Sequence, residues 1–376
     1  MEAAPGGVPS EGPSPGPPLP EPDGDHGRDR GGRLSSRNGG GGRAGQRRGL
    51  VRRRPVPVGP HRSGIEDIGG GAAVKDRFYR FLTFLTRHLG AWVFLLVAWF
   101  IATGYFLFFP RRVAVSVRFY RRLLPGRSRF HPLWCAWRQY HHFVRVFLDR
   151  FLLTEGADLP TTYEGWDHLV AAAESGRGGI VLMSHVGNWE IAAHLLKHYG
   201  RSHPRMKLLL YLGEKHREQI ERRQKKSVVM NGIRVIAVPE EGGSPMDIVE
   251  GLNFLREGGL VSLTGDRLWG RDPRTVDVRF AGARARIPET PFVLALMSGA
   301  PLLIFFAYRT RGGVYQLITK PPLTVRAASR SARADAIAAA AQTYADALEE
   351  TVRAHPFEWY HFEPFLLEDP AAGPGQ

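Results

Sequence analysis

Cysteine is nearly absent from this chain of 376 residues, which contains only Cys135. One cysteine cannot form an internal disulfide or a cysteine-based zinc site. The sequence also lacks a Gly-x-Ser-x-Gly elbow, a phosphate-binding Gly-x4-Gly-Lys-Ser/Thr loop and a His-Glu-x-x-His helix. His361 and Glu363 are not followed by the Pro-Cys-x-x-Cys of zinc deaminases. These absences argue against α/β-hydrolases, P-loop enzymes and the common zinc enzymes.

Acidic residues are scarce in two segments, and these segments carry most of the net charge of +15. Residues 1–64 contain 11 Arg or Lys against 6 Asp or Glu, and residues 111–130 contain seven arginines and no acidic residue. The rest of the chain is nearly balanced in charge. This argues against a globular nucleic-acid-binding domain, and we predict no nucleic-acid partner.

Large apolar residues are rare in residues 1–70, which are rich in Pro, Gly and Arg. Such a segment cannot bury enough surface to offset its chain entropy, so we predict a disordered tail. The tail is either a solvated or untranslated extension, or a basic arm that touches anionic lipid or nucleic acid. Residues 368–376 are predicted to form a disordered C-terminus.

Charged residues are missing from residues 89–109, an apolar run of 21 residues that ends at Pro110, Arg111 and Arg112. A helix of this length is about 31 Å long, close to the hydrocarbon thickness of a bilayer. A buried soluble helix is the alternative, although such helices usually keep a polar stripe. We predict a membrane helix and a basic interfacial segment within residues 75–130, with residues 113–124 along the membrane surface.

The distribution of basic residues predicts the orientation of this helix. Seven arginines follow it within 20 residues, whereas only four basic residues, at positions 75, 77, 80 and 87, precede it. By the positive-inside rule, we expect the protein at the cell inner (cytoplasmic) membrane, with the domain that follows the helix on the cytoplasmic side. A hairpin or an interfacial helix remains an alternative.

The pattern of residues 131–367 predicts a single folded domain. Aromatic residues first recur at helical spacing, and after Gly179 short apolar runs alternate with helical segments. This alternation predicts a three-layer α/β domain with a mixed, largely parallel sheet. The expected strands are 180–184, 206–212, 233–238, 260–264, 276–280, 302–308 and 314–319, and the expected helices are 189–199, 214–229, 246–257, 291–298 and 332–353.

A histidine and a glutamate lie where one of these strands changes into a helix. Residues 180–183 are apolar and β-branched, as in a strand buried on both faces, and Gly187 and Asn188 are turn and N-cap residues. His185 therefore lies at the carboxyl end of a strand, where open α/β sheets bind their ligands, with Glu190 nearby. A histidine with a carboxylate in reach can take a proton from a hydroxyl.

The spacing alone does not establish a catalytic pair. The same interval occurs at three places, which are His61 with Glu66, His185 with Glu190, and His216 with Glu221. Only His185 has the strand–turn–helix context. From the residues alone, a catalytic base and a structural histidine remain equally good interpretations.

A second polar cluster follows the apolar strand 260–264. Gly265, Asp266 and Arg267 place a carboxylate and a guanidinium at the end of that strand. Asp266 can orient an imidazole, and Arg267 suits a phosphate or a developing oxyanion. We expect both to share a site with His185, and a structural turn with a local ion pair is the alternative.

These motifs together resemble a known family. The segments are 184–190, 265–267 and 280–288, followed by the aromatic segment 356–365. In this order and spacing they resemble the bacterial lysophospholipid acyltransferase superfamily, and within it the lipid A biosynthesis (lauroyl/myristoyl) acyltransferases and the related mannoside acyltransferases. The match covers roughly residues 75–367. One departure is that the family usually has Pro-x-Gly-Pro where this chain has Thr290 in place of the glycine, between Pro288 and Pro291.

The resemblance implies a glycerolipid acyltransferase-like fold over residues 131–367 and an O-acyltransferase activity. A fatty acyl group would pass from a thioester of acyl carrier protein or coenzyme A to a hydroxyl of a lipid or glycolipid, with no metal and no cofactor. His185 would be the base, Glu190 or Asp266 would orient it, and Arg267 and backbone N–H groups near Gly187 would hold the oxyanion or a phosphate. The residues implied in substrate binding are Gly187, Asn188, Phe280, Gly282 and Pro288.

Two other classes remain as alternatives. A membrane-anchored hydrolase would use the same side chains to activate water on an ester or thioester. A non-enzymatic membrane scaffold would depend on its basic tail and would not need His185. The sequence does not identify the acceptor lipid, the donor carrier or the chain length.

Overall fold

A computed structural model describes residues 81–367 apart from 82–83, 87, 193–204, 215–232, 240–241 and 271–272. The predicted tail 1–70, the C-terminus 368–376 and the predicted helix 214–229 lie outside the described residues, apart from residue 214. Of the predicted helix 189–199, only residues 189–192 are described.

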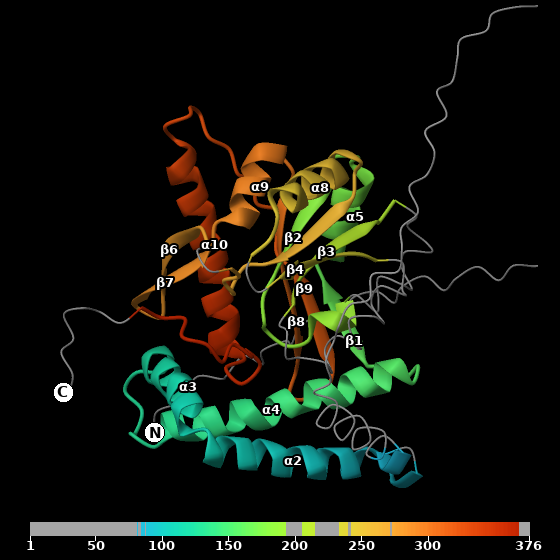
Figure 1. The fold of residues 1–376 in the computed structure, drawn as a ribbon, viewed down its shortest axis with the longest axis vertical. Coiled ribbons are helices and arrows are strands. Elements are labelled where there is room, and N and C mark those ends of the chain that lie inside the picture. The colour runs from blue at the N-terminus through green and yellow to red at the C-terminus, as the bar shows by residue number, and fades with distance from the viewer. Residues whose placement is uncertain are drawn as a thin grey trace, which may run out of the picture. The chain divides into compact units, whose positions relative to one another are not determined.

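A seven-stranded sheet forms the centre of the fold (Figure 1). Its order is β1-β9-β8-β2-β5-β3-β4, and all neighbours are parallel except β8 and β9, which are antiparallel. This confirms the predicted mixed, largely parallel sheet. The strands are β1 (Thr161–Glu164), β2 (Gly179–Met183), β3 (Leu208–Glu214), β4 (Arg234–Pro239), β5 (Leu260–Thr264), β8 (Leu302–Arg309) and β9 (Tyr315–Thr319).

The central strand β2 is buried on both faces because its residues are apolar without interruption. Successive side chains of a strand point to opposite faces. Ile180 and Leu182 accordingly pack into one core cluster, whereas Val181 and Met183 pack into another. Both faces of β2 therefore pack into the core. Polar side chains that could act in a site appear only after the strand ends at Met183.

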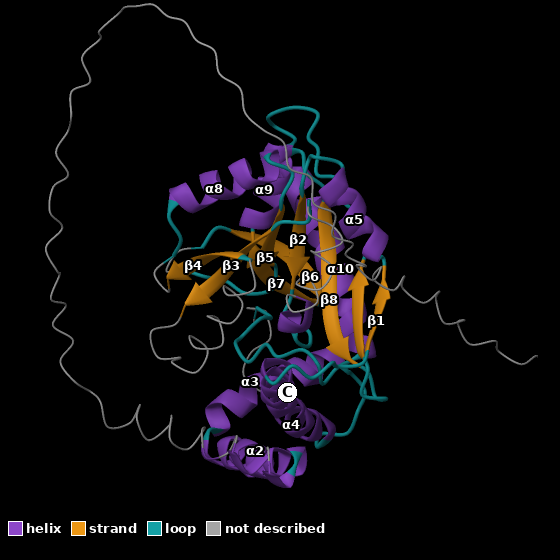
Figure 2. Ribbon diagram, turned by 90° about the vertical axis from the view of Figure 1, so that its right-hand side faces the viewer, coloured by secondary structure: helices purple, strands orange, loops and turns teal. Residues whose placement is uncertain are grey.

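Helices cover both faces of the sheet (Figure 2). The first core cluster contains side chains from α8 (Pro245–Arg256), α9 (Thr290–Ser298) and α10 (Arg333–Ala354), and the second contains side chains from α5 (Trp166–Glu174). Helix α10 corresponds to the predicted helix 332–353, and its apolar face is buried. Ser244 caps α8 through a capping box with Asp247.

The predicted strand 276–280 does not join the main sheet. It forms β6 (Thr275–Phe280), which pairs with β7 (Ala283–Pro288) in a separate antiparallel hairpin. Ala281 and Gly282 both have positive φ, as a two-residue hairpin turn of type I′ requires. The side-chain amide of Gln342 in α10 bonds both the N–H and the carbonyl of Arg279, so it docks the hairpin to the helix.

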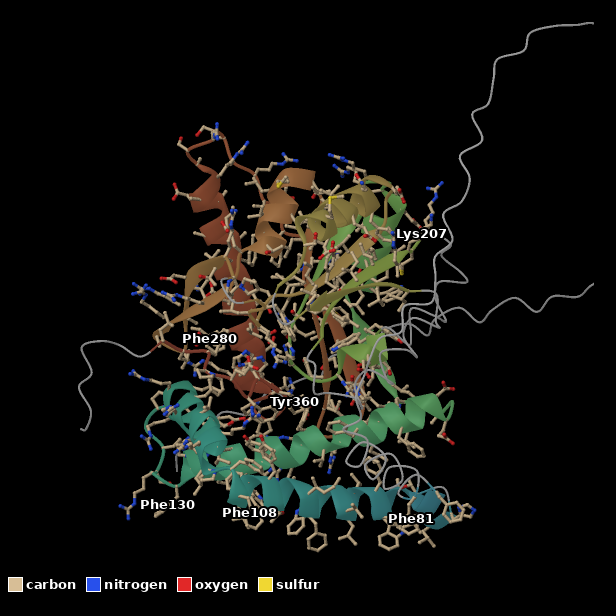
Figure 3. All side chains as sticks on the ribbon, viewed as in Figure 1. Phe81, Phe108, Phe130, Lys207, Phe280 and Tyr360 are labelled. Atoms are coloured by element: carbon tan, nitrogen blue, oxygen red, sulfur yellow. The ribbon has the colours of Figure 1, made fainter. Side chains whose placement is uncertain are left out.

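Helices α2 (Ala91–Phe108), α3 (Pro110–Leu123) and α4 (His131–Thr154) precede the sheet. By length and composition, α2 could cross a membrane, with a mean hydropathy of 2.0. One face of α2 packs on α4, where the Phe94 and Phe151 rings lie 6.4 Å apart. The opposite face exposes large apolar side chains, and only 22% of the helix is buried. Figure 3 shows Phe108 and Phe130 on the side of these helices that faces away from the sheet.

Candidate active site

The two polar clusters meet because β2 and β5 are neighbouring parallel strands. Met183 ends β2 opposite Thr264, which ends β5. His185 and Asp266 each follow two residues later. Parallel strands end at the same edge of a sheet, so the two side chains emerge side by side. The predicted proximity of His185 and Asp266 is confirmed, although 81 positions separate them in sequence.

The Asp266 carboxylate fixes the tautomer of His185. Oδ1 lies 2.8 Å from Nδ1 of the His185 ring, and Oδ2 accepts the backbone N–H of His185 at 2.7 Å. Oδ2 also accepts the indole N–H of Trp359 at 2.8 Å. An ionised carboxylate can only accept, so Nδ1 carries the proton and Nε2 carries the lone pair. Nε2 is then the basic nitrogen of a ring that lines a cavity.

Asp266 is ionised although it is only 1% exposed. Burial by itself raises the pKa of a carboxyl. The hydrogen bonds from His185, and its positive charge when the ring is protonated, outweigh this effect and hold the pKa of Asp266 well below its usual range. The site therefore contains a fixed negative charge behind the imidazole, which favours an imidazolium when the ring takes up a proton.

Glu190 and Arg267 belong to ion pairs beside this dyad. Glu190 pairs with Arg150, with Arg150 Nε and Glu190 Oε2 2.7 Å apart. Of the two carboxylates predicted to orient His185, it is therefore that of Asp266 that lies beside Nδ1. Arg267 donates from Nη2 to Glu363 Oε1 at 2.6 Å. The Arg267 guanidinium also lies over the Trp269 ring, 5.3 Å from its centroid.

Two of the backbone N–H groups near Gly187, those of Gly187 and Asn188, are already used within the fold. The Gly187 N–H donates to the Glu358 carbonyl and the Asn188 N–H donates to the Ala307 carbonyl, both at 2.7 Å. These two hydrogen bonds join the turn after β2 to the C-terminal segment and to β8. Gly187 itself has a φ of 70°, and a Cβ there would lie 2.0 Å from the Ala307 oxygen. This position therefore requires glycine on steric grounds.

Asn188 provides a different donor. Its side chain is 1% exposed, and Oδ1 accepts the Glu190 N–H at 3.1 Å. Its Nδ2 has no hydrogen-bond partner among the residues that the structure describes. Since Asn188 lines the same cavity as His185, this amide is a candidate donor for a substrate oxygen.

A cavity of about 450 Å³ opens at the dyad. Five residues predicted from the sequence line it, namely His185, Gly187, Asn188, Glu190 and Arg267. Apolar side chains of α2 and α4 form another part of the wall, including Ile101, Ala102, Phe143 and Phe147. The site thus faces the apolar N-terminal helices as well as the sheet.

Three predicted substrate-binding residues lie away from the cavity wall. Gly282 is at the tip of the β6–β7 hairpin and Pro288 is at its base, opposite Thr275. Phe280 is fully buried, with its ring 5.7 Å from that of Trp359. Phe280 therefore packs behind the residue that bonds Asp266.

The C-terminal segment, residues 356–367, supplies groups to which the sequence assigned no role. Besides Trp359, it brings His361 to the cavity, with the His361 and His185 ring centroids 6.3 Å apart. His361 stacks on Trp359 and donates from Nδ1 to the Glu363 carbonyl. Burial lowers the pKa of His361 to about 4. In the sequence, only the aromatic composition of the C-terminal segment indicated that the segment is important.

Helices α3 and α4 hold the C-terminal segment in place. Tyr120 donates to the Pro356 carbonyl and Gln139 donates to the Trp359 carbonyl, both at 2.6 Å. His142 Nδ1 lies 2.9 Å from Glu358 Oε1. Within the described ranges, no group of three or more histidine, cysteine or acidic residues could hold a metal ion.

Comparison with known proteins agrees with this architecture. Residues 151–367 match the model of the bacterial lipid A biosynthesis acyltransferases. This chain belongs to that family. It is also 28% identical over 208 residues to a phosphatidylinositol mannoside acyltransferase of Mycobacterium tuberculosis H37Rv, a match that covers 54% of this chain and 60% of the relative. The protein of the same name in Mycolicibacterium smegmatis is 24% identical over 205 residues, covering 54% and 61%. The chain thus spans about three fifths of the length of these relatives.

Proposed function

We propose that the protein transfers a fatty acyl group from a thioester of acyl carrier protein or coenzyme A to a hydroxyl of a lipid or glycolipid. The observation that carries this proposal is the bond between His185 Nδ1 and Asp266 Oδ1, which leaves a basic Nε2 on a ring that lines the cavity. Membership of the acyltransferase family supports the reaction class.

The chemistry requires only side chains and the two substrates. His185 Nε2 takes the proton from the acceptor hydroxyl as its oxygen attacks the thioester carbonyl. The tetrahedral intermediate then collapses, the carbon–sulfur bond breaks, and the imidazolium returns the proton to the leaving thiolate. Asp266 stabilises the imidazolium between these two steps. No acyl-enzyme, metal or cofactor takes part.

The oxyanion of the intermediate needs hydrogen-bond donors on the cavity wall. With the Gly187 and Asn188 backbone N–H groups engaged, the candidates are the Arg267 guanidinium and the Asn188 side-chain amide. Arg267 brings a positive charge, and its contact with Glu363 sets the position of the guanidinium. We assign the oxyanion to these two groups.

A membrane surface is the proposed location, with the catalytic domain on the cytoplasmic side of the inner membrane. The exposed face of α2 carries Trp92, Leu96 and Phe100, while its other face packs on α4. The helix α3 that follows exposes arginines. An apolar face beside arginines is typical of a helix that lies in the interface, and this arrangement keeps the α2–α4 contact in place. We therefore favour the interfacial alternative over a helix that crosses the bilayer.

The acceptor is proposed to carry a sugar or another polyol on a lipid. Two similar proteins are named for acylation of phosphatidylinositol mannosides, and the family is named for lipid A. Both names describe glycolipids. A mannosylated phospholipid and a lipid A precursor are thus the first acceptors to test.

The proposed function predicts that His185→Ala abolishes acyl transfer. A general base typically contributes about 10²- to 10⁴-fold to a rate. Purified protein would be incubated with each thioester donor and each acceptor, and the products measured by lipid mass spectrometry. Transfer gives a heavier acceptor lipid, whereas the rival hydrolase gives only free fatty acid. Thermal unfolding of the variant should match that of the wild type. Transfer within a few-fold of wild type would refute the role of His185.

A further inference from the structure

The cavity wall includes a third arginine whose surroundings differ from those of the other two. Arg150 lies against Glu190 and Arg267 against Glu363, so both have a carboxylate neighbour. Arg112, at the start of α3, lines the same cavity. Its guanidinium has no ion-pair partner among the residues that the structure describes. An arginine without a carboxylate at a cavity wall is available to an anionic ligand.

Two buried hydroxyl groups lie close to one another, and neither has another hydrogen-bond partner in the described part of the chain. They are Tyr140 Oη in α4, on a side chain that is 6% exposed and lines the cavity, and Ser116 Oγ in α3, on a side chain that is 2% exposed. Buried hydroxyls are normally paired, because an unpaired one costs its lost hydration. Helical serines often bond the carbonyl four residues earlier, as Ser298 does with Leu294, but Ser116 does not.

Arg112 and Ser116 are four residues apart in α3, so their side chains share one face of that helix, and Arg112 and Tyr140 line the same cavity. Burial raises the pKa of Tyr140 to about 12, and the adjacent Tyr105 adds to this effect. The Ser116 hydroxyl and the Arg112 guanidinium act on the same hydroxyl in the opposite, smaller direction. The Tyr140 hydroxyl therefore keeps its proton at physiological pH and can donate it in a hydrogen bond.

We propose that Arg112 and the hydroxyl of Tyr140 form a subsite for a phosphate group of a substrate that enters the cavity, with Ser116 beside Tyr140. A guanidinium and a neutral hydroxyl donor match the acceptor oxygens of a phosphate. The subsite rests on the proposed function in that its ligand is a phosphate-bearing thioester donor or a phospholipid acceptor. Both sources present the same chemistry to these side chains.

Binding measurements test the subsite without requiring catalysis. Coenzyme A would serve as the donor probe and dihexanoyl phosphatidylglycerol as the lipid probe, with titration by calorimetry. Arg112→Ala and Tyr140→Phe should each weaken binding of one probe by about tenfold to a hundredfold, because each loses a charge-assisted hydrogen bond. Loss for coenzyme A assigns the phosphate to the donor, and loss for the lipid assigns it to the acceptor.

Arg111→Ala is the matched control. Arg111 has the same charge, precedes Arg112 in α3 and is exposed, but it does not line the cavity. This variant should bind both probes as the wild type does. The proposal is overturned if the wild type binds neither probe, or if Arg112→Ala and Tyr140→Phe bind both as tightly as Arg111→Ala. The two proposals can fail separately: if the wild type binds a probe through Arg112 but transfers no acyl group from any donor to any acceptor, only the proposed function is refuted.

Discussion

Asp266 accepts three hydrogen bonds, from the ring and the backbone N–H of His185 and from the Trp359 indole. Three donors around a buried carboxylate hold it as an anion, because a protonated acid would bring a fourth proton into the group. The imidazole is thereby fixed in orientation and tautomer. This arrangement leaves the chemistry of the site to one nitrogen, Nε2 of His185.

Asp266→Asn should lower kcat by about 10²- to 10⁴-fold with little change in fold. An asparagine that keeps the Oδ2 contacts presents NH₂ to His185 Nδ1, so the ring must adopt the tautomer with its proton on Nε2. That tautomer cannot act as a base toward the acceptor. Steady-state kinetics would measure the effect, with Trp359→Phe as a control that removes one donor and should cost less. Near-wild-type turnover in Asp266→Asn would contradict the assignment.

His361 is expected to make the protein less stable in mild acid. Its folded pKa of about 4 lies below the ordinary histidine value of about 6.5. Between these values the unfolded chain binds more protons than the folded protein, so the free energy of unfolding falls as the pH decreases through this window and then levels off. In His361→Phe the free energy of unfolding should change less with pH in this window. Denaturant unfolding at pH 7 and pH 5 would give the free energy of unfolding of both proteins. The same change in this free energy between the two pH values in wild type and His361→Phe would refute the prediction.

At the scale of elements, the turn after β2 and the turn of the β6–β7 hairpin offer a matched comparison. Gly187 and Gly282 have nearly the same φ, 70° and 73°. A Cβ at Gly187 would collide with the Ala307 carbonyl, whereas a Cβ at Gly282 meets nothing within 4 Å. Alanine at Gly282 would therefore meet only backbone strain, whereas alanine at Gly187 would meet the same strain together with a steric collision.

Gly282→Ala should cost about 1–3 kcal/mol, the usual cost of an unfavourable backbone conformation. Gly187→Ala should cost more, because the collision adds to the same strain, and it should also displace His185 two residues earlier. Thermal and denaturant unfolding of both variants would compare the two costs. A Gly187→Ala variant as stable as Gly282→Ala would show that the turn can move without penalty.

The sequence predicted the central elements better than the peripheral ones, for physical reasons. Strands such as β2 and β5 are continuous apolar runs, so both their burial and the meeting of His185 with Asp266 at one edge could be predicted. The short strand β1 and helix α5 were not predicted, because Thr161–Glu164 has no apolar run. The pairing of β6 with β7 depends on the turn at Ala281 and Gly282. This turn could not be predicted from the pattern of hydrophobic residues.

The site was predicted in part for a similar reason. Position at a strand end indicated His185, Asp266 and Arg267. The donor role of Trp359 could not be inferred, because an indole N–H that bonds a distant carboxylate leaves no trace in local sequence. The engagement of the Gly187 N–H by Glu358 likewise depends on a contact between segments 171 positions apart.

At the scale of the whole molecule, α2 has an exposed apolar face on one side and contributes to the cavity wall on the other. The exposed side chains Trp92, Leu96 and Phe100 are 48–61% exposed, while Ile101 and Ala102 of the same helix line the cavity. A helix that contacts lipid on one side and the cavity on the other would let an acyl chain or lipid acceptor reach His185 without crossing water.

Replacing Trp92, Leu96 and Phe100 together with serine should release the protein from lipid vesicles while preserving its fold. Each large apolar side chain contributes about 1.5–3 kcal/mol when it leaves water, so binding should fall by far more than tenfold. Vesicle flotation would measure this. As a control, Phe94→Ser changes the face that packs on α4, and it should lower the melting temperature instead. Unchanged flotation of the triple variant would exclude α2 as the membrane contact.

The C-terminal segment has a consequence for how the protein is made. The Glu358 carbonyl accepts the Gly187 N–H, the Tyr360 N–H donates to the His185 carbonyl, and Trp359 bonds Asp266. These three residues leave the ribosome more than 90 residues after Asp266. Throughout that interval the nascent chain carries His185 and Asp266 without the groups that fix them. The site is therefore complete only after the C-terminal segment has been synthesised and has folded onto it, and a product of premature termination before Trp359 would lack the bond from Trp359 to Asp266.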